Sequence, residues 1–376
     1  MSWENFILQG FSQLPLVIQI AIVISLLAIV TTAMVFISIL IMRGVRAYKG
    51  RRNSRFIQQA DSLVLEQVIM NEGLQDDKGF EFLPSKAFHV LPLEKKWVRR
   101  LLVERIMEYR KNFSGSVSNK LRQLYIALRL QNDAQRNINS LWWNKKVSAI
   151  SELFSMEVGG MEDEIFPLLH HRNRYVRGIS RCYFVKMSED QPFEFLSDIR
   201  NPLVTWEQFE LFNIIVQRKD MKLPLFSRWM NADCHPSVIS FCFKLAVYFQ
   251  QYETIPAIMR FIDSDNEALQ VDAINSLGKL VAEEAEPAMV AIYPAASLAV
   301  KVEILKALGR IGSGKYLAFL EDVFETSDEF LLRKHSAKSI VNHEALSKKE
   351  LLELESHSDA GSLVFLHHAM NPLIKY

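Results

Sequence analysis

The sequence predicts an all-α protein in which one N-terminal membrane-spanning helix is followed by an elongated stack of helix pairs. Three observations predict it: an apolar segment of 29 residues without charge, a cluster of cations directly after it, and a repeat of about 31 residues in the carboxyl half. With 376 residues, 49% of them hydrophobic, the chain is long enough to bury a large core. The repeat favours one array over separate domains.

The apolar segment, residues 14–42, has the length and composition of a transmembrane helix. Between Leu14 and Met42 no side chain is charged, and a helix of this length would measure ~44 Å against a hydrocarbon core of ~30 Å. Eighteen of these residues are Leu, Ile, Val or Phe, which favours insertion by at least ~5 kcal/mol. A cleavable signal peptide would carry a basic segment upstream, whereas Glu4 is the only charged residue there. We therefore expect a retained anchor.

Six cations follow the span and predict its orientation. Because positive side chains stay on the cytoplasmic side, residues 1–13 should face outward and the rest of the chain should be cytoplasmic. The protein is thus expected in the cell membrane as a single-pass protein. The same cations form a candidate membrane-surface site for anionic headgroups of the lipid bilayer: Arg43, Arg46, Lys49, Arg51, Arg52 and Arg55.

Residues 43–113 are predicted to form a basic juxtamembrane stalk and amphipathic helices. The best of these helices carries a helically spaced apolar stripe made of Val98, Leu102, Ile106, Tyr109 and Phe113. Its other side is rich in lysine and arginine. That side is either a solvated face or a surface for lipid or an acidic partner, and the sequence leaves both open.

Two segments 31 residues apart show the repeat most clearly. Residues 269–280 read LQVDAINSLGKL and residues 300–311 read VKVEILKALGRI. A preceding helix repeats as well, since Ile255-Pro256 is followed by Glu286-Pro287 at the same spacing. Proline suits the first turn of a helix, and glycine suits a close helix approach or a helix end. Each unit is therefore a pair of helices.

These residues resemble the HEAT-repeat family, in particular its bacterial short-repeat members. The resemblance implies an α-solenoid of HEAT-like helix pairs over residues 114–348, best defined over 253–343, with residues 349–376 as a cap or tail. HEAT proteins generally bind other macromolecules on their concave surface. The resemblance also points to three possible partner-contact residues at the step that follows the first valine or leucine of the second helix: Arg177, Lys301 and Arg333.

No catalytic, cofactor or metal site is predicted, and we expect no enzyme activity. Residues 309–315 match the GxxxxGK part of a phosphate-binding loop, but Tyr316 replaces the serine or threonine, and a repeat helix precedes it instead of a strand. The pairs His170-His171 and His367-His368 lack a third ligand. Cys182, Cys234 and Cys242 have no CxxC spacing and fit core thiols. With 44 basic and 43 acidic residues, nucleic acid is not an expected partner.

The leading functional hypothesis is a membrane-anchored scaffold or adaptor for protein–protein interaction. Its partner is unidentified and would be membrane-associated, for example an integral-membrane enzyme such as a glycosyltransferase. One alternative is a HEAT-like enzyme or cofactor-binding array that holds a metal, a nucleotide or a bilin. A second alternative is a lipid-surface or envelope-organising module in which the basic segments bind the membrane.

Overall fold

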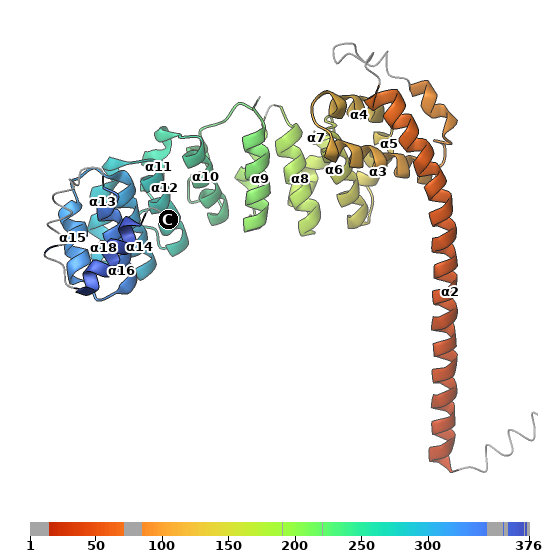
Figure 1. The fold of residues 1–376 in the computed structure, drawn as a ribbon, viewed down its shortest axis with the longest axis horizontal. Coiled ribbons are helices and arrows are strands. Elements are labelled where there is room, and N and C mark those ends of the chain that lie inside the picture. Colours follow the sequence, from red (N-terminus) through yellow and green to blue (C-terminus); the bar gives the residue numbers. More distant parts are fainter. Residues whose placement is uncertain are drawn as a thin grey trace, which may run out of the picture. The chain divides into compact units, whose positions relative to one another are not determined.

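The structure is a computed structural model that describes residues 15–70, 85–189, 191–219, 221–343, 356, 360–371 and 373. Among these residues the regular elements are helices, and no β-strand occurs (Figure 1). The chain divides into two compact units, Met1–Asp133 and Ala134–Tyr376. The all-α prediction is confirmed. The predicted outward segment 1–13 lies outside the described residues.

One long helix, α2 (Leu16–Val64), runs through the first unit and continues as a π-helical turn, Leu65–Ile69. Its most apolar stretch is wholly exposed, with a mean hydropathy of 2.8 and none of it buried within the protein. Further along, Phe56, Ala60 and Val64 are buried at intervals of four residues, so they lie on one face of the helix. The helix is therefore apolar all round in its first half and amphipathic in its second.

The amphipathic half of α2 packs against α3 (Lys96–Asn112), which in turn contacts α4 (Ser116–Ala127). The predicted stripe is correct in its centre, because Val98, Leu102 and Ile106 are fully buried. The ring of Trp97 lies edge-on to that of Phe56, with centroids 5.8 Å apart. Apolar contact on one face of each helix thus holds this unit together.

Among the described residues of the second unit, seven helices begin at nearly constant intervals. The residues that immediately precede them are 31 residues apart, with 32 at the last step: Trp142, Asn173, Val204, His235, Asn266, Ser297 and Glu329. We call these helices the second helices and count positions from the preceding residue. They are α6 (Trp143–Met156), α8 (Arg174–Met187), α9 (Thr205–Gln217), α10 (Pro236–Tyr248), α12 (Glu267–Lys279), α14 (Leu298–Ile311) and α16 (Phe330–Val341).

The first element of each pair is shorter and varies more. Before α9 and α10 it is a single 3-10 turn, Glu194–Asp198 and Phe226–Trp229. In α11 and α13 proline occupies the first turn, as predicted at Pro256 and Pro287. The remaining first elements are α5 (Gln131–Ile138), which crosses the unit boundary, α7 (Glu162–Ile165), α11 (Ile255–Met259), α13 (Glu286–Ile292) and α15 (Leu317–Thr326).

Side chains cap four of the second helices at the residue that defines the period. Asn173, His235, Asn266 and Ser297 each accept a hydrogen bond from a backbone N–H of the first turn. Such a cap satisfies one of the four unpaired donors at a helix start and contributes about 1 kcal/mol. The capping residue therefore recurs with the repeat.

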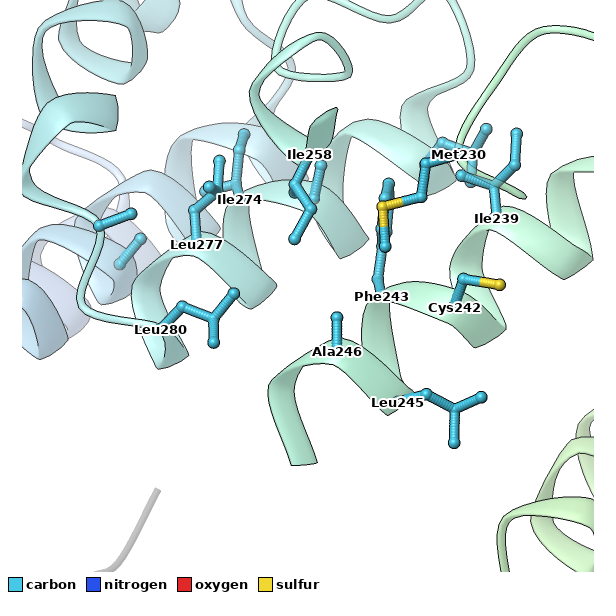
Figure 2. Packing of buried hydrophobic residues seen from close by; sticks show 14 of the residues in the cluster. Met230, Ile239, Cys242, Phe243, Leu245, Ala246, Ile258, Ile274, Leu277 and Leu280 are labelled. Atoms are coloured by element: carbon cyan, nitrogen blue, oxygen red, sulfur yellow. The ribbon is translucent and has the colours of Figure 1, made fainter. Parts of the chain in front are cut away.

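The apolar side chains of neighbouring pairs form one continuous core in the second unit. Figure 2 shows Ile258 of α11 with Ile274 and Leu277 of α12 on one side of it. Phe243, Met230 and Ile239 lie on its other side. Because each pair buries its apolar face only against its neighbours, the array grows by stacking. This is an α-solenoid, as predicted.

The last described helix, α18 (Ala360–Met370), packs against α16 and covers the end of the stack. Leu366 and Ala369 are buried there, and the carbonyl oxygen of Ala369 accepts a hydrogen bond of 2.7 Å from Nζ of Lys338. Within the predicted cap or tail, 349–376, the described helix α18 thus packs on α16.

Candidate functional site

The second helices α9, α10 and α12 enclose a groove with a volume of about 450 Å³. Its apolar lining comes from Phe209, Phe212, Phe241, Val247 and Tyr248. The remaining lining residues are polar or charged: Thr205, Gln208, Ser240, Lys244, Asp272, Asn275, Ser276 and Lys279. A groove of this volume, apolar inside with a few polar groups, has the character of a binding site.

The groove lies at a contact between neighbouring second helices that lacks glycine. We call such a contact a seam. At position 12, α12 and α14 carry Gly278 and Gly309. A Cβ added at Gly278 would lie 2.8 Å from Cα of Ala307 on α14. A Cβ added at Gly309 would lie 2.8 Å from Cα of Ser339 on α16. Only glycine permits backbones to approach this closely. At the same position α10 carries Val247, and α10 packs less closely on α12 than α12 packs on α14.

Two lysines and one aspartate supply the charges of the groove. Nζ of Lys244, an exposed residue, donates to Oε1 of Gln208 on α9 at 3.0 Å. The Oγ of Ser240 donates to a carboxylate oxygen of Asp272 on α12 at 2.5 Å. Lys279 is exposed at the end of α12. The lone carboxylate is therefore hydrogen bonded and half-buried, whereas the lysines extend into solvent.

Beyond the groove, the same face of the solenoid carries a second group of charges around Glu303 of α14. Glu303 is buried, and its carboxylate accepts hydrogen bonds from Asn275 at 2.6 Å, Arg310 at 2.9 Å and Lys306 at 3.2 Å. Two cations thus share one carboxylate. Cations exceed anions here, as they do in the groove.

The buried imidazole of His335 on α16 lies near this group. Burial, together with the charges of Lys306 and Lys334, lowers the pKa of His335 to about 4, and Glu303 opposes this shift. His335 is therefore neutral at physiological pH.

A buried ion pair joins α8 to α9 on the other side of the groove. Nη1 of Arg181 donates to Oε1 of Glu207 at 2.9 Å, and both side chains are within a few per cent of fully buried. They occupy positions 8 and 3, which are apolar in most other second helices. The exposed face of α9 carries two aromatic rings, Trp206 and Phe209, with 56% and 63% of their surface in solvent.

The three predicted partner-contact residues share position 4 of their second helices and are all half-buried. Nη1 of Arg177 donates to the carbonyl oxygen of His171 at 2.9 Å. Nζ of Lys301 lies 5.5 Å from the ring centre of Tyr293. Arg333 donates to Oγ of Ser362 and lies 5.1 Å from the ring of Phe365. At the same position Gln270 donates to the carbonyl oxygen of Ile262, so position 4 commonly holds the preceding loop.

The predicted membrane-surface cations lie along one stretch of α2. Each of the six is exposed: Arg43, Arg46, Lys49, Arg51, Arg52 and Arg55. Arg52 also lies 4.0 Å above the ring of Trp97. In α3 the situation differs, because Arg99 pairs with Asp133, Arg105 with Asp61 and Arg100 with Glu104. Much of the basic side of α3 is therefore neutralised within the protein.

The GxxxxGK segment is the end of a repeat helix. Gly309 is inside α14, and Gly312 ends it in the left-handed conformation with φ of 65°. Nζ of Lys315 pairs with Glu283 at 3.0 Å, and Oγ of Ser313 donates to Glu286. These contacts hold the turn against the preceding pair.

The other chemical candidates serve packing or capping. Burial raises the pKa of the Cys182 thiol to about 12 and also raises that of Cys242, so both thiols stay protonated. His235 is a helix cap, and His170 lies 3.7 Å from Asp198. Among the described residues no group of three or more His, Cys, Asp or Glu side chains is arranged to hold a metal ion.

Sequence reasoning did not find the groove. Its signal was available in the alignment of the repeats, where Val247 stands in the place of Gly278 and Gly309. The consequence of that difference depends on which neighbour position 12 faces, and the backbone is needed to establish this.

Comparison with known proteins supports the repeat. A family model of HEAT repeats matches residues 255–341. No curated protein matches the sequence. The solved structures that resemble it include the crystal structure of Kap121p, with 12% identity and a TM-score of 0.32 over 77% of this chain and 33% of that one. A Kap121p mutant gives 12% identity and a TM-score of 0.22 over 84% and 33%.

This chain thus spans about a third of the length of those structures. HEAT solenoids typically serve as scaffolds for protein interaction. The resemblance stated from the sequence is supported for the best-defined repeats: residues 255–341 match the HEAT-repeat model, and they lie in the carboxyl part of an α-solenoid.

Proposed function

We propose that this protein is a membrane-anchored scaffold that binds a membrane-associated protein partner through its second helices. The observation that carries the anchor is the first half of α2, which is strongly apolar and wholly exposed while the rest of the chain has its own core. An exposed apolar helix of this length is unfavourable in water and favourable in a bilayer. The six cations that follow it favour a cytoplasmic solenoid.

The groove across α9, α10 and α12 supports the scaffold part of the proposal. The exposed rings of Phe209 and Tyr248 at the groove are the type of residue that dominates protein interfaces. Anchoring confines the solenoid to the membrane, which raises its effective concentration toward partners in the same bilayer. A modest contact area would then suffice for a working complex.

Anchoring is tested by fractionation of the full-length protein. We expect it to stay in the membrane pellet after alkaline carbonate extraction, and a reporter fused to its C-terminus should be protected from protease added outside the cell. Release into the supernatant, or a C-terminal reporter that is digested outside, would contradict the anchor or its orientation.

Scaffolding is tested by a photoreactive amino acid placed at Phe209 in the intact membrane. The matched control is Phe330, which is 61% exposed on α16 and does not line the groove. We expect a discrete crosslinked product from the first position and none from the second. Equal labelling at both positions, or none at the groove, would count against a partner bound there.

A further inference from the structure

The groove has helical walls, and this restricts what can occupy it. Its lining residues come from α9, α10 and α12, whose backbone N–H and C=O groups are paired inside each helix. No strand edge is offered to an extended peptide, which would leave its own backbone groups unpaired against an apolar surface. An occupant that carries its own backbone hydrogen bonds, an α-helix, fits such walls better.

The interior of the groove selects apolar side chains. Phe212 and Tyr248 meet edge to face, with centroids 5.0 Å apart, and Phe241 is buried beneath them. Phe209 is 63% exposed and Tyr248 51%, so both rings are available for contact with a partner. A volume of about 450 Å³ can receive a few apolar side chains from one face of a helix.

The charges of the groove favour acidic side chains on the polar face of the bound helix. Lys244 and Lys279 are exposed, while the carboxylate of Asp272 is held by Ser240 and half-buried. The adjoining group repeats this imbalance, because Lys306 and Arg310 share Glu303. An approaching cation would meet an excess of positive charge, whereas a carboxylate would meet two exposed lysines.

From these three restrictions we infer that the groove binds an acidic amphipathic α-helix of a partner protein. Its apolar face lies on Phe209, Phe212 and Tyr248, and its carboxylates pair with Lys244 and Lys279. The inference deepens the proposed scaffold function and rests on it only for the presence of a protein partner. Binding by the groove itself does not depend on the anchor.

The test uses the full-length protein in nanodiscs of neutral lipid and a designed peptide as probe. The peptide carries leucine and phenylalanine on one helical face and glutamate on the other, with a fluorophore for anisotropy. Three companions have lysine in place of glutamate, a scrambled order, or a central proline. Empty nanodiscs measure binding to lipid alone.

We expect the acidic helical peptide to bind at least tenfold more tightly than each companion, and its affinity to fall as salt is raised. Equal binding of the lysine peptide would overturn the charge assignment. Equal binding of the proline peptide would overturn the inference that the bound segment is helical.

Variants locate the site. Phe209→Ala and the pair Lys244→Glu with Lys279→Glu should each weaken the acidic peptide about tenfold, and the charge-reversed protein should now prefer the lysine peptide. Matched controls are Phe330→Ala and Lys222→Glu, both exposed and outside the groove. Unchanged affinity in the groove variants, with thermal unfolding unaltered, would overturn the inference. Carbonate extraction of the same variants reports on the anchor separately.

Discussion

The second helices pack differently in two parts of the solenoid, which we call the closed half (α12, α14 and α16) and the open half (α8, α9 and α10). Between α12, α14 and α16 the seam has glycine at position 12 and small residues opposite, so the backbones lie close and the seam is closed. Between α8 and α9 the seam carries a buried ion pair, and a groove opens where α10, with Val247 at position 12, packs on α12. One repeat thus yields a closely packed region and an open region that exposes aromatic side chains.

The difference shows that a groove in a repeat array need not come from inserted loops. The second helices start 31 residues apart in both halves, with 32 at the last step, so the period is nearly constant. What changes is the size and charge of the side chains at a few seam positions. Substitutions at these positions are therefore the direct way to test the comparison.

The largest effect is expected at the buried ion pair of the open half. Glu207→Leu removes the carboxylate and leaves the guanidinium of Arg181 buried without its charge partner, which should cost about 3–5 kcal/mol of unfolding free energy. Burial already lowers the pKa of Arg181, while Glu207 opposes this. Thermal unfolding followed by circular dichroism measures the loss.

A double variant gives the control for this prediction. Arg181→Met combined with Glu207→Leu removes both charges and places apolar side chains where most other second helices have them. It should recover most of the lost stability. If the double variant unfolds as early as Glu207→Leu alone, the damage comes from altered packing and not from a stranded charge.

The next effect is expected from forcing the closed seam open. Gly278→Val gives α12 the residue that α10 has at position 12, but the added Cβ would lie 2.8 Å from Cα of Ala307. Overpacking of this kind costs about 1–3 kcal/mol. We expect a lower melting temperature together with faster hydrogen exchange in α12 and α14. A variant as stable as the parent would show that valine at this position does not decide seam width.

Acid should weaken the closed half through His335. Its pKa of about 4 in the folded protein lies below the ordinary value of 6.5, so the unfolded chain binds the proton more tightly. Stability is then fully present above pH 6.5 and is lost as pH falls toward 4, by about 2 kcal/mol between pH 7 and pH 5. His335→Gln should flatten this part of the pH–stability profile. An unchanged slope in the variant would assign it to other groups.

Much of the closed half could be predicted from the sequence. Pro256, Pro287 and the glycines 278 and 309 recur at the repeat spacing, and each has a local physical role that does not depend on distant contacts. The long apolar helix was equally predictable, because its segment is apolar all round instead of on one face. Strong local sequence signals therefore predicted the helices and the repeat period.

The open half was harder to read for a physical reason. Glu207 and Arg181 are polar at positions where the pattern expects apolar residues, and they are tolerated only because they meet each other across the seam. The first elements there shrink to single 3-10 turns, which leave little periodicity to detect. Arg181 and Glu207 are 26 residues apart in the sequence, so their pairing depends on the tertiary structure and has no local sequence signal. The boundaries of the repeats before α10 were consequently not predicted from the sequence, and neither was the groove that they border.

The smallest prediction sharpens the comparison by placing the same change in both halves. Gly178 lies inside α8, and the nearest neighbours of a Cβ there would be Oε1 of Glu207 at 3.5 Å and Trp206 at 3.9 Å, which are ordinary contacts. Alanine favours a helix over glycine by up to about 1 kcal/mol, so Gly178→Ala should raise the melting temperature slightly. Gly278→Ala should lower it, because the clash with Ala307 outweighs the gain in helix propensity. Opposite signs from one substitution would show that glycine is required by close backbone approach only in the closed seam, whereas equal signs would remove that distinction between the halves.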